Sequence, residues 1–315
     1  METMLHNFLN TYWLRPETAL WRTLDVEAMK GFQFASPSLD LGCGDGNFSF
    51  LRAGGTFTES FDAFMQVGNL EHFFDNVDVY DYYKDPENGN EGGGGYTCQL
   101  PDYSIDVGLD HKTSLLNKAK KLNFYRELVE ADANQGLPFE DESFQTVFSN
   151  IIYWLNDPPA VFREIARILK KGGMCCAMLP GPVYLDSSFY YTLYLQGKRD
   201  EFEFLKQIDR GRITDNLKIV NTREKWQEII ETAGLTVEAC VPHLSKTMLQ
   251  ISDIGLRPLF PLLKKMTLQI EPSALLKMKK EWVDLFETLG APIVKNDALL
   301  AGGKEFGFFC FILRK

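Results

Sequence analysis

The sequence predicts an α/β protein whose core is a parallel sheet, doubly wound so that helices cover both faces. Two observations predict this fold. Apolar, strand-like runs alternate with amphipathic segments along most of the 315 residues, and such alternation is typical of a parallel sheet between two layers of helices. The first strand-like run, Ser38 to Leu41, leads directly into a turn with glycine at every second position, 42, 44 and 46.

The strands and helices follow one another in a regular order. We expect strands at residues 38–42, 104–110, 125–130, 146–152, 174–179, 236–241 and 306–313. Helices are expected over 114–121 and 222–233, and a third after Asp157, which suits an N-cap before Pro158. Lys170 and Lys171 suit the last turn of that third helix, because cations complement its dipole before two glycines stop it.

The remaining segments read as additions to one domain. Residues 1–36 form a helical lead-in, in which a helix opens near Pro16, and residues 37–315 form the main domain. Insertions are expected at about 53–103, 181–220 and 245–296. The first is strongly acidic and contains the glycine-rich run 88–95, which predicts a flexible loop. The second is rich in Tyr and Phe, the third is largely helical, and together the insertions predict a cap.

Composition excludes several classes of partner. A formal net charge of −10 opposes attraction to nucleic acid or to anionic lipid. No apolar run approaches the roughly 20 residues that span a bilayer, and the first twelve residues lack the pattern of a signal peptide. The six cysteines form no Cys-x-x-Cys pair, which fits a reducing compartment. We therefore expect a cytoplasmic protein that binds no nucleic acid, membrane or metal, with a homodimer among the expected states.

The glycine turn is the strongest candidate for a ligand site. Glycines at 42, 44 and 46 let the backbone approach a ligand closely and adopt positive φ. The amides of the turn, and of the helix expected after it, then face whatever lies above the end of the strand. An ordinary strand-to-helix turn that uses glycine only for its geometry is the alternative that the turn alone leaves open.

Four blocks of sequence, in order, resemble the class I S-adenosylmethionine-dependent methyltransferases, in the small-molecule branch similar to ubiquinone and menaquinone biosynthesis enzymes. The blocks are Leu39 to Gly46, Val107 to Asp110, Glu130 to Ala133 with Leu137 to Phe139, and Phe162 to Gly173. A fifth stretch, Asp141 to Val147, carries Gln145 where the family usually has Asp. The resemblance implies a Rossmann-like, seven-stranded, mostly parallel sheet with an antiparallel last strand and helical cap insertions.

The resemblance also implies a cofactor, S-adenosyl-L-methionine, with S-adenosyl-L-homocysteine as its product. Asp40, Gly42, Cys43, Gly44 and Gly46 would meet the methionine half of the cofactor. The adenosine half would be met by the following residues: Asp110 at the ribose hydroxyls, Asp132 and Ala133 at the adenine amino group, and His111 beside the ring. Asn150 and Ile151 would lie beside the sulfonium.

The ribose acid has a competing assignment. The family places this acid about 20 residues after the glycine turn, where Glu59 and Asp62 stand, whereas Asp110 lies 70 positions beyond Asp40. We prefer Asp110 because a strand-like run precedes it and because its 22-residue spacing to Asp132 fits the family. Residues 53–103 are then an insertion.

The reaction itself needs few catalytic groups, because methyl transfer is an in-line displacement that depends largely on positioning. His243, just past the sixth expected strand, and Tyr12 in the lead-in are the candidates for a general base. The expected partner is a small-molecule acceptor whose identity the sequence leaves open. Alternatives are a catalytically silent S-adenosylmethionine-binding partner protein and an NAD-dependent oxidoreductase, although Asn47 stands where the latter's third glycine belongs.

Overall fold

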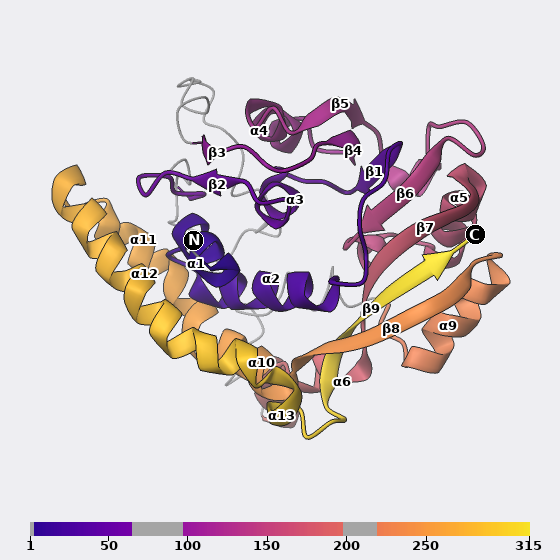
Figure 1. Ribbon diagram of the computed structural model, residues 1–315. Coiled ribbons are helices and arrows are strands. Elements are labelled where there is room, and N and C mark those ends of the chain that lie inside the picture. The colour runs from indigo at the N-terminus through magenta and orange to yellow at the C-terminus, as the bar shows by residue number, and fades with distance from the viewer. Residues whose placement is uncertain (1–2, 65–96, 198–218) are drawn as a thin grey trace.

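The computed structural model describes residues 3–64, 97–197 and 219–315, so the glycine-rich run 88–95 lies outside the described residues. Its centre is a seven-stranded sheet in the order β5-β4-β1-β6-β7-β9-β8 (Figure 1). The pairs from β5 to β7 are parallel, and β9 runs antiparallel to both of its neighbours. The predicted sheet is thus confirmed, with its antiparallel last strand.

The strands of this sheet lie close to their predicted places. They are β1 (Ser38–Leu41), β4 (Ile105–Asp110), β5 (Tyr125–Glu130), β6 (Phe144–Ser149), β7 (Leu169–Pro180), β8 (Thr236–Ser245) and β9 (Phe306–Arg314). A second, antiparallel pair joins β2 (Thr56–Phe57) to β3 (Thr97–Gln99) within the first insertion.

Helices connect and cover the strands. They are α1 (Met4–Thr11), α2 (Pro16–Ala28), α3 (Asn47–Arg52), α4 (Thr113–Lys121), α5 (Pro158–Ile168), α6 (Pro182–Asp186), α7 (Phe189–Gln196), α9 (Arg223–Thr232), α10 (Lys246–Ile251), α11 (Phe260–Thr267), α12 (Pro272–Lys295) and α13 (Asp297–Leu300). Short helical turns are η2 (Ala133–Gln135), η3 (Ile152–Trp154), η4 (Ser252–Leu256) and η5 (Arg257–Leu259).

Several boundaries differ from the sequence prediction, among them the end of β8, which extends to Ser245 and so includes His243. The fourth predicted strand ends at Ser149, and Ile152 already belongs to the turn η3. Asp157 caps α5 as predicted, since its side chain accepts from the amide of Ala160. The prediction that α5 continues through Lys171 was wrong, because the chain is extended from Leu169 onward, where it pairs with Phe144 of β6. Lys170 and Lys171 therefore belong to β7.

Each face of the sheet carries its own apolar layer, as the alternation of side chains along a strand requires. Cys175 and Phe311 point into a cluster with α5 and α9. Their neighbours Cys176 and Ile312 point into a cluster with the end of α2. Figure 1 shows α2 lying across this second face. The sheet is thus buried on both sides, and its carboxyl edge is left for the site.

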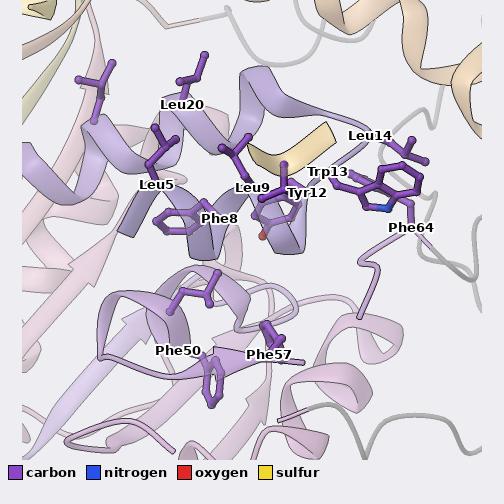
Figure 2. Packing of buried hydrophobic residues seen from close by; sticks show 14 of the residues in the cluster. Leu5, Phe8, Leu9, Tyr12, Trp13, Leu14, Leu20, Phe50, Phe57 and Phe64 are labelled. Atoms are coloured by element: carbon purple, nitrogen blue, oxygen red, sulfur yellow. The ribbon is translucent and has the colours of Figure 1, made fainter. Parts of the chain in front are cut away.

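The lead-in is part of the core rather than a separate lid. Phe8 of α1 is fully buried and stacks on Tyr12 and on Phe48, the latter at 6.1 Å between ring centroids. Figure 2 shows Phe8 of α1 on the side of the helix that faces Phe50 and Phe57, and all three residues belong to one buried apolar cluster. The lead-in therefore packs against the helix that follows the glycine turn.

The beginning of the first insertion is fastened to the helical cap. Lys279 of α12 donates hydrogen bonds to the backbone carbonyls of Glu59, at 2.7 Å, and of Phe61. Lys280 pairs with the Glu59 carboxylate at 2.6 Å, and Lys264 of α11 lies 3.7 Å from Asp62. Within the described ranges, no helix is both long and apolar enough to cross a membrane.

Candidate active site

The glycine turn joins β1 to α3 at the carboxyl edge of the sheet. Gly42, Gly44 and Gly46 all have positive φ, at +80°, +57° and +76°. A Cβ on Gly42 would lie 2.1 Å from the side chain of Ile151, whereas a Cβ on Gly44 would meet nothing within 4 Å. Gly42 is therefore needed for packing, and Gly44 presents bare backbone to open space.

Asp110 ends β4 beside this open backbone. One carboxylate oxygen, Oδ2, accepts a hydrogen bond from the amide of Gly44 at 3.0 Å, and Oδ1 accepts from the amide of Lys112 at 2.9 Å. The exposed ring of His111 lies 3.6 Å from Oδ1. The structure thus brings Asp110, His111 and the glycine turn together, and their contacts with the cofactor stay predictions.

Glu59 and Asp62, the competing candidates for the ribose acid, lie elsewhere. As described above, both are engaged with lysines of α11 and α12. Among these three acids, Asp110 alone is bonded to the glycine turn.

Asp40 lies beneath the turn rather than at its open side. It is buried, and its Oδ2 accepts hydrogen bonds from the hydroxyls of Ser49 at 2.6 Å and Tyr125 at 2.7 Å. Burial raises the pKa of Asp40 to about 6, although these two hydrogen bonds act in the opposite direction. Burial likewise raises the pKa of the neighbouring Cys43 thiol, which therefore stays protonated. The contact expected between Asp40 and the cofactor ammonium stays a prediction.

Asp132 and Ala133 follow β5, at the same edge of the sheet. The exposed Asp132 caps the short turn η2, its Oδ1 accepting from the amide and the side chain of Asn134, each at 2.9 Å. This arrangement fixes the direction of the chain where adenine is expected.

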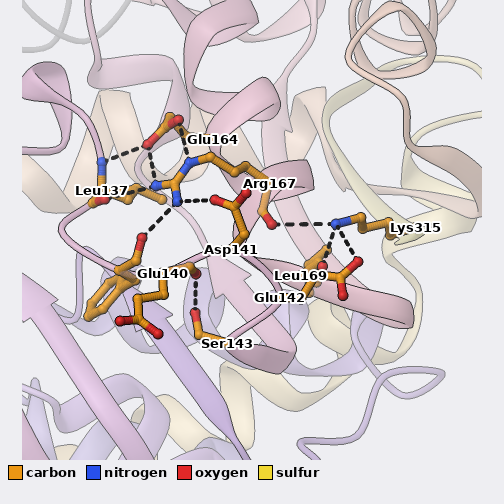
Figure 3. Close-up of polar contacts among 10 residues, drawn as sticks. Leu137, Glu140, Asp141, Glu142, Ser143, Glu164, Arg167, Leu169 and Lys315 are labelled. Atoms are coloured by element: carbon orange, nitrogen blue, oxygen red, sulfur yellow. Dashed lines mark hydrogen bonds and ion pairs between the residues drawn. The ribbon is translucent and has the colours of Figure 1, made fainter.

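The loop after η2 is held by a charged network that the sequence analysis did not identify (Figure 3). Arg167 donates to Glu164, to Asp141 at 2.9 Å, and to the carbonyls of Leu137 and Phe139 at 3.0 and 2.7 Å. Glu164 also accepts from the amide of Leu137 at 3.0 Å. The spacing of Glu164 and Arg167, three residues apart on one helix, was the available signal. Its consequence for the loop is visible only in three dimensions.

Asn150 and Ile151 follow β6, and the Ile151 side chain lies against Gly42 of the glycine turn. The hydroxyl of Ser149 donates to the carbonyl of Leu41 at 2.9 Å and accepts from the amide of Ile151 at 3.3 Å. Because the Ile151 side chain abuts Gly42, the ends of β1 and β6 form one continuous surface.

His243 and Tyr12, the candidate bases, have different surroundings. His243 is buried near the end of β8, with its Nε2 3.0 Å from Oδ1 of Asp25 in α2. The other oxygen of Asp25 accepts from Arg22 at 2.9 Å. Tyr12 is buried against Phe8 and against Phe64, 6.1 Å away between centroids. Asp25 was not identified from the sequence as the partner of His243, because 218 positions separate the two residues.

A metal centre has no candidate in the described ranges, since no cluster of three or more His, Cys, Asp or Glu side chains occurs there.

Comparison with known families agrees with this geometry. The model of a family described as a methyltransferase domain matches residues 91–177, which include β4, β5, β6 and most of β7. This part of the chain is therefore similar to a methyltransferase domain. The match covers the predicted ribose acid Asp110 and the adenine segment at Asp132.

Curated methyltransferases are similar to about half of the chain. Malonyl-[acyl-carrier protein] O-methyltransferase 1 of Coxiella burnetii is 27% identical over 150 residues, which are 47% of this chain and 48% of that protein. 2-Methyl-6-phytyl-1,4-hydroquinone methyltransferase 1, chloroplastic, of Oryza sativa subsp. japonica is 28% identical over 145 residues, 44% of this chain and 42% of that protein. The chain thus spans about half the length of the curated relatives it matches.

Solved structures of methyltransferases are similar at a lower level. A putative sarcosine dimethylglycine methyltransferase from Galdieria sulphuraria is 14% identical, with a TM-score of 0.45 covering 96% of this chain and 86% of that one. Geranyl diphosphate C-methyltransferase from Streptomyces coelicolor A3(2) is 12% identical, with a TM-score of 0.43 over 95% and 84%. The fold assignment rests on the order and direction of the strands in the sheet and not on these similarities.

Proposed function

We propose that the protein transfers a methyl group from S-adenosylmethionine to a small-molecule acceptor. One observation carries the proposal: the open backbone of Gly44 and the carboxylate of Asp110 meet at the carboxyl edge of a methyltransferase sheet. In open α/β sheets this edge is where ligands bind. The names of the curated relatives, an O-methyltransferase and a hydroquinone methyltransferase, support the same class of reaction.

The residues present fit the cofactor. A carboxylate offers only acceptors, so Asp110 suits a pair of ribose hydroxyls. Gly44 leaves space where a side chain would stand, which suits the methionine half lying against the turn. Asp132 and Ala133 would meet the adenine amino group, and Asn150 and Ile151 would border the sulfonium.

Bound S-adenosylmethionine supplies an electrophilic methyl group on sulfur, so this chain has to align the acceptor and receive its proton. His243 is the proton acceptor in the proposal, because Asp25 fixes its ring from the other side. Tyr12 stays a prediction for this role, since in the structure its ring packs between Phe8 and Phe64.

Binding calorimetry with S-adenosylhomocysteine and with NAD tests the cofactor assignment. We expect binding of the first and none of the second; a preference for NAD would reverse the assignment. Turnover of a metabolite extract with a methyl-labelled donor then separates an enzyme from a silent binding protein, because only an enzyme transfers label to a small molecule.

The proposed setting is the cytoplasm, with no nucleic acid or membrane partner. The net charge of −10 and the free cysteines of the described residues, Cys43, Cys175, Cys176, Cys240 and Cys310, support it. Cell fractionation tests the location, and light scattering tests the expected homodimer.

A further inference from the structure

Arg22 of α2 lies next to the residues that follow the glycine turn. Its guanidinium carbon is 5.5 Å from the centre of the Phe48 ring, and Phe48 is the second residue of α3. Burial raises the pKa of Asp45 in the turn, and the nearby charge of Arg22 acts in the opposite direction. Arg22 is therefore a positive charge within electrostatic reach of the turn where the cofactor is expected.

Arg22 is also connected to the proposed proton acceptor. Its Nη1 donates to Oδ2 of Asp25 at 2.9 Å, and Oδ1 of the same carboxylate lies 3.0 Å from Nε2 of His243. Asp25 and His243 are both buried. An unbroken series of contacts, through Phe48, Arg22 and Asp25, therefore joins the helix after the glycine turn to His243 on β8.

Aromatic residues from other elements surround the same region. Tyr12, which follows α1, and Tyr153, which follows β6, both lie within electrostatic reach of Arg22. The ring of Tyr153 is 5.7 Å from that of Phe308, and the Phe308 ring is 6.1 Å from that of His243. Arg22 thus lies where the chain after β6, the end of β8 and the start of β9 meet α2, at the carboxyl edge of the sheet.

The hydrogen-bonding capacity of Arg22 is only partly used. A guanidinium carries five N–H donors, and within the described parts of the chain Arg22 donates to Asp25 alone. Asp25 does not form a bidentate pair with it, because the other carboxylate oxygen is engaged with His243. No Arg22 nitrogen is both buried and unpaired, and 34% of the side chain is exposed, so the remaining donors are open to solvent.

The charges of this group favour an added anion during the proposed reaction. Burial acts to lower the pKa of Arg22, but the Asp25 carboxylate holds it above its ordinary value, so Arg22 stays charged. Asp25 balances this charge while His243 is neutral. Once His243 has accepted a proton, the group holds two cations and one anion. A ligand anion on Arg22 would restore the balance, which matters because charges in buried surroundings are costly unless they are paired.

We propose that Arg22 binds a carboxylate of a bound ligand, at the junction between the glycine turn and the Asp25–His243 pair. The planar guanidinium matches a carboxylate with two parallel N–H···O bonds, which a neutral or cationic group cannot form. This inference rests on the proposed function and names a ligand group that its site holds. The carboxylate has two possible sources, the methionine end of the cofactor and the methyl acceptor, and the test distinguishes them.

The first arm of the test examines the cofactor as the source. S-adenosylhomocysteine and its decarboxylated analogue, 5′-deoxy-5′-(3-aminopropylthio)adenosine, differ only in the carboxylate. By calorimetry the full chain should bind the first about tenfold more tightly, and Arg22→Gln should remove this difference by weakening S-adenosylhomocysteine alone. Arg126→Gln is the control. Arg126 of β5 also pairs with an aspartate, Asp106, at 2.7 Å, and its loss should leave both affinities unchanged.

The second arm examines the acceptor as the source. In that case Arg22→Gln should bind S-adenosylhomocysteine as the wild type does. With this ligand at saturation, benzoate and 2-naphthoate should bind the wild type about tenfold more tightly than benzamide and 2-naphthamide, and Arg22→Gln should remove the preference. Arg22→Lys keeps the charge without the planar fork, so it should restore only part of the preference in whichever arm shows one.

The outcomes separate this inference from the proposed function. If S-adenosylhomocysteine fails to bind the wild type, the proposed function itself fails. If it binds, but Arg22→Gln and Arg22→Lys keep the wild-type preference for carboxylates, or the wild type shows no preference in either arm, the inference about Arg22 is overturned and the proposed function stands. Equal weakening of S-adenosylhomocysteine and its decarboxylated analogue in Arg22→Gln would also overturn it, because a general loss of structure does not depend on the carboxylate.

Discussion

The carboxylate of Asp110 accepts a hydrogen bond from the backbone amide of Gly44 across 3.0 Å, although 66 positions separate the two residues. This bond joins the end of β4 to the turn after β1. The two strands are neighbours in the sheet, so the contact forms in spite of the long insertion between them. It places the Asp110 carboxylate, an anionic hydrogen-bond acceptor, beside the open backbone of Gly44.

The space in front of Gly44 leads to a first prediction. Gly44→Ala should fold, because a Cβ there meets nothing within 4 Å, and should lose about 1–2 kcal/mol of unfolding free energy to the left-handed backbone. Its affinity for S-adenosylhomocysteine should fall at least tenfold, because the methyl group occupies the ligand's space. Gly172→Ala is the matched control, with φ +75° and equally open surroundings in β7. Equal affinity of the two variants in calorimetry would contradict the placement of the cofactor.

Asp40 leads to a prediction about pH. Its folded-state pKa of about 6 lies above the ordinary 3.8, so the folded state binds this proton more tightly than the unfolded state. The group's contribution to stability therefore falls as pH rises from about 4 to about 6, by up to about 3 kcal/mol. Asp40→Asn, which still accepts from Ser49 and Tyr125, should match the wild type in urea unfolding at pH 4 and exceed its stability at pH 7.

Asp106 provides the control of opposite sign. Burial acts to raise its pKa, but hydrogen bonds from Ser38 and the charge of Arg126 hold the pKa below its ordinary value. Asp106→Asn should therefore lose stability relative to the wild type as pH rises through the range below 4. The stability of Asp40→Asn relative to the wild type should therefore differ between pH 4 and pH 7. An equal difference at both pH values would show that ionisation of Asp40 does not destabilise the folded protein.

The Arg167 network leads to a prediction about the loop near adenine. Arg167→Met removes the donors to the carbonyls of Leu137 and Phe139, so unfolding free energy should fall by about 1–3 kcal/mol. Affinity for S-adenosylhomocysteine should fall several-fold, because the loop is no longer fixed. The exposed Arg163 on the same helix supplies the control, Arg163→Met, which should change neither quantity. Thermal unfolding and calorimetry measure the two effects, and identical values for both variants would contradict the role of the network.

Local patterns predicted most of the fold. The amphipathic repeat and the cap at Asp157 placed α5, and the apolar runs placed the seven strands, because burial on both faces of a sheet leaves a periodic signal. The end of α5 was misplaced because Lys170 and Lys171 suit a helix end, whereas pairing of Leu169 with Phe144 of β6 makes the chain extended there. That pairing is a tertiary contact, which no window of sequence contains.

The residues of the candidate site were likewise only partly identified from the sequence. The glycine turn and Asp110 have motif spacing and were identified, whereas Asp25 and Arg22 were missed. They belong to an ordinary amphipathic helix, and their significance comes only from His243, which the fold brings to them from β8.

The most direct test of the central claim is the affinity of S-adenosylhomocysteine, measured by calorimetry for the wild type, Asp110→Ala and Glu59→Gln. A carboxylate that holds both ribose hydroxyls contributes about 1.5–3 kcal/mol, so Asp110→Ala should weaken binding by about ten- to a hundredfold. Glu59→Gln should bind like the wild type, because Glu59 is engaged with Lys280 of the cap. Undiminished affinity in a folded Asp110→Ala variant, or a loss in Glu59→Gln instead, would contradict the account.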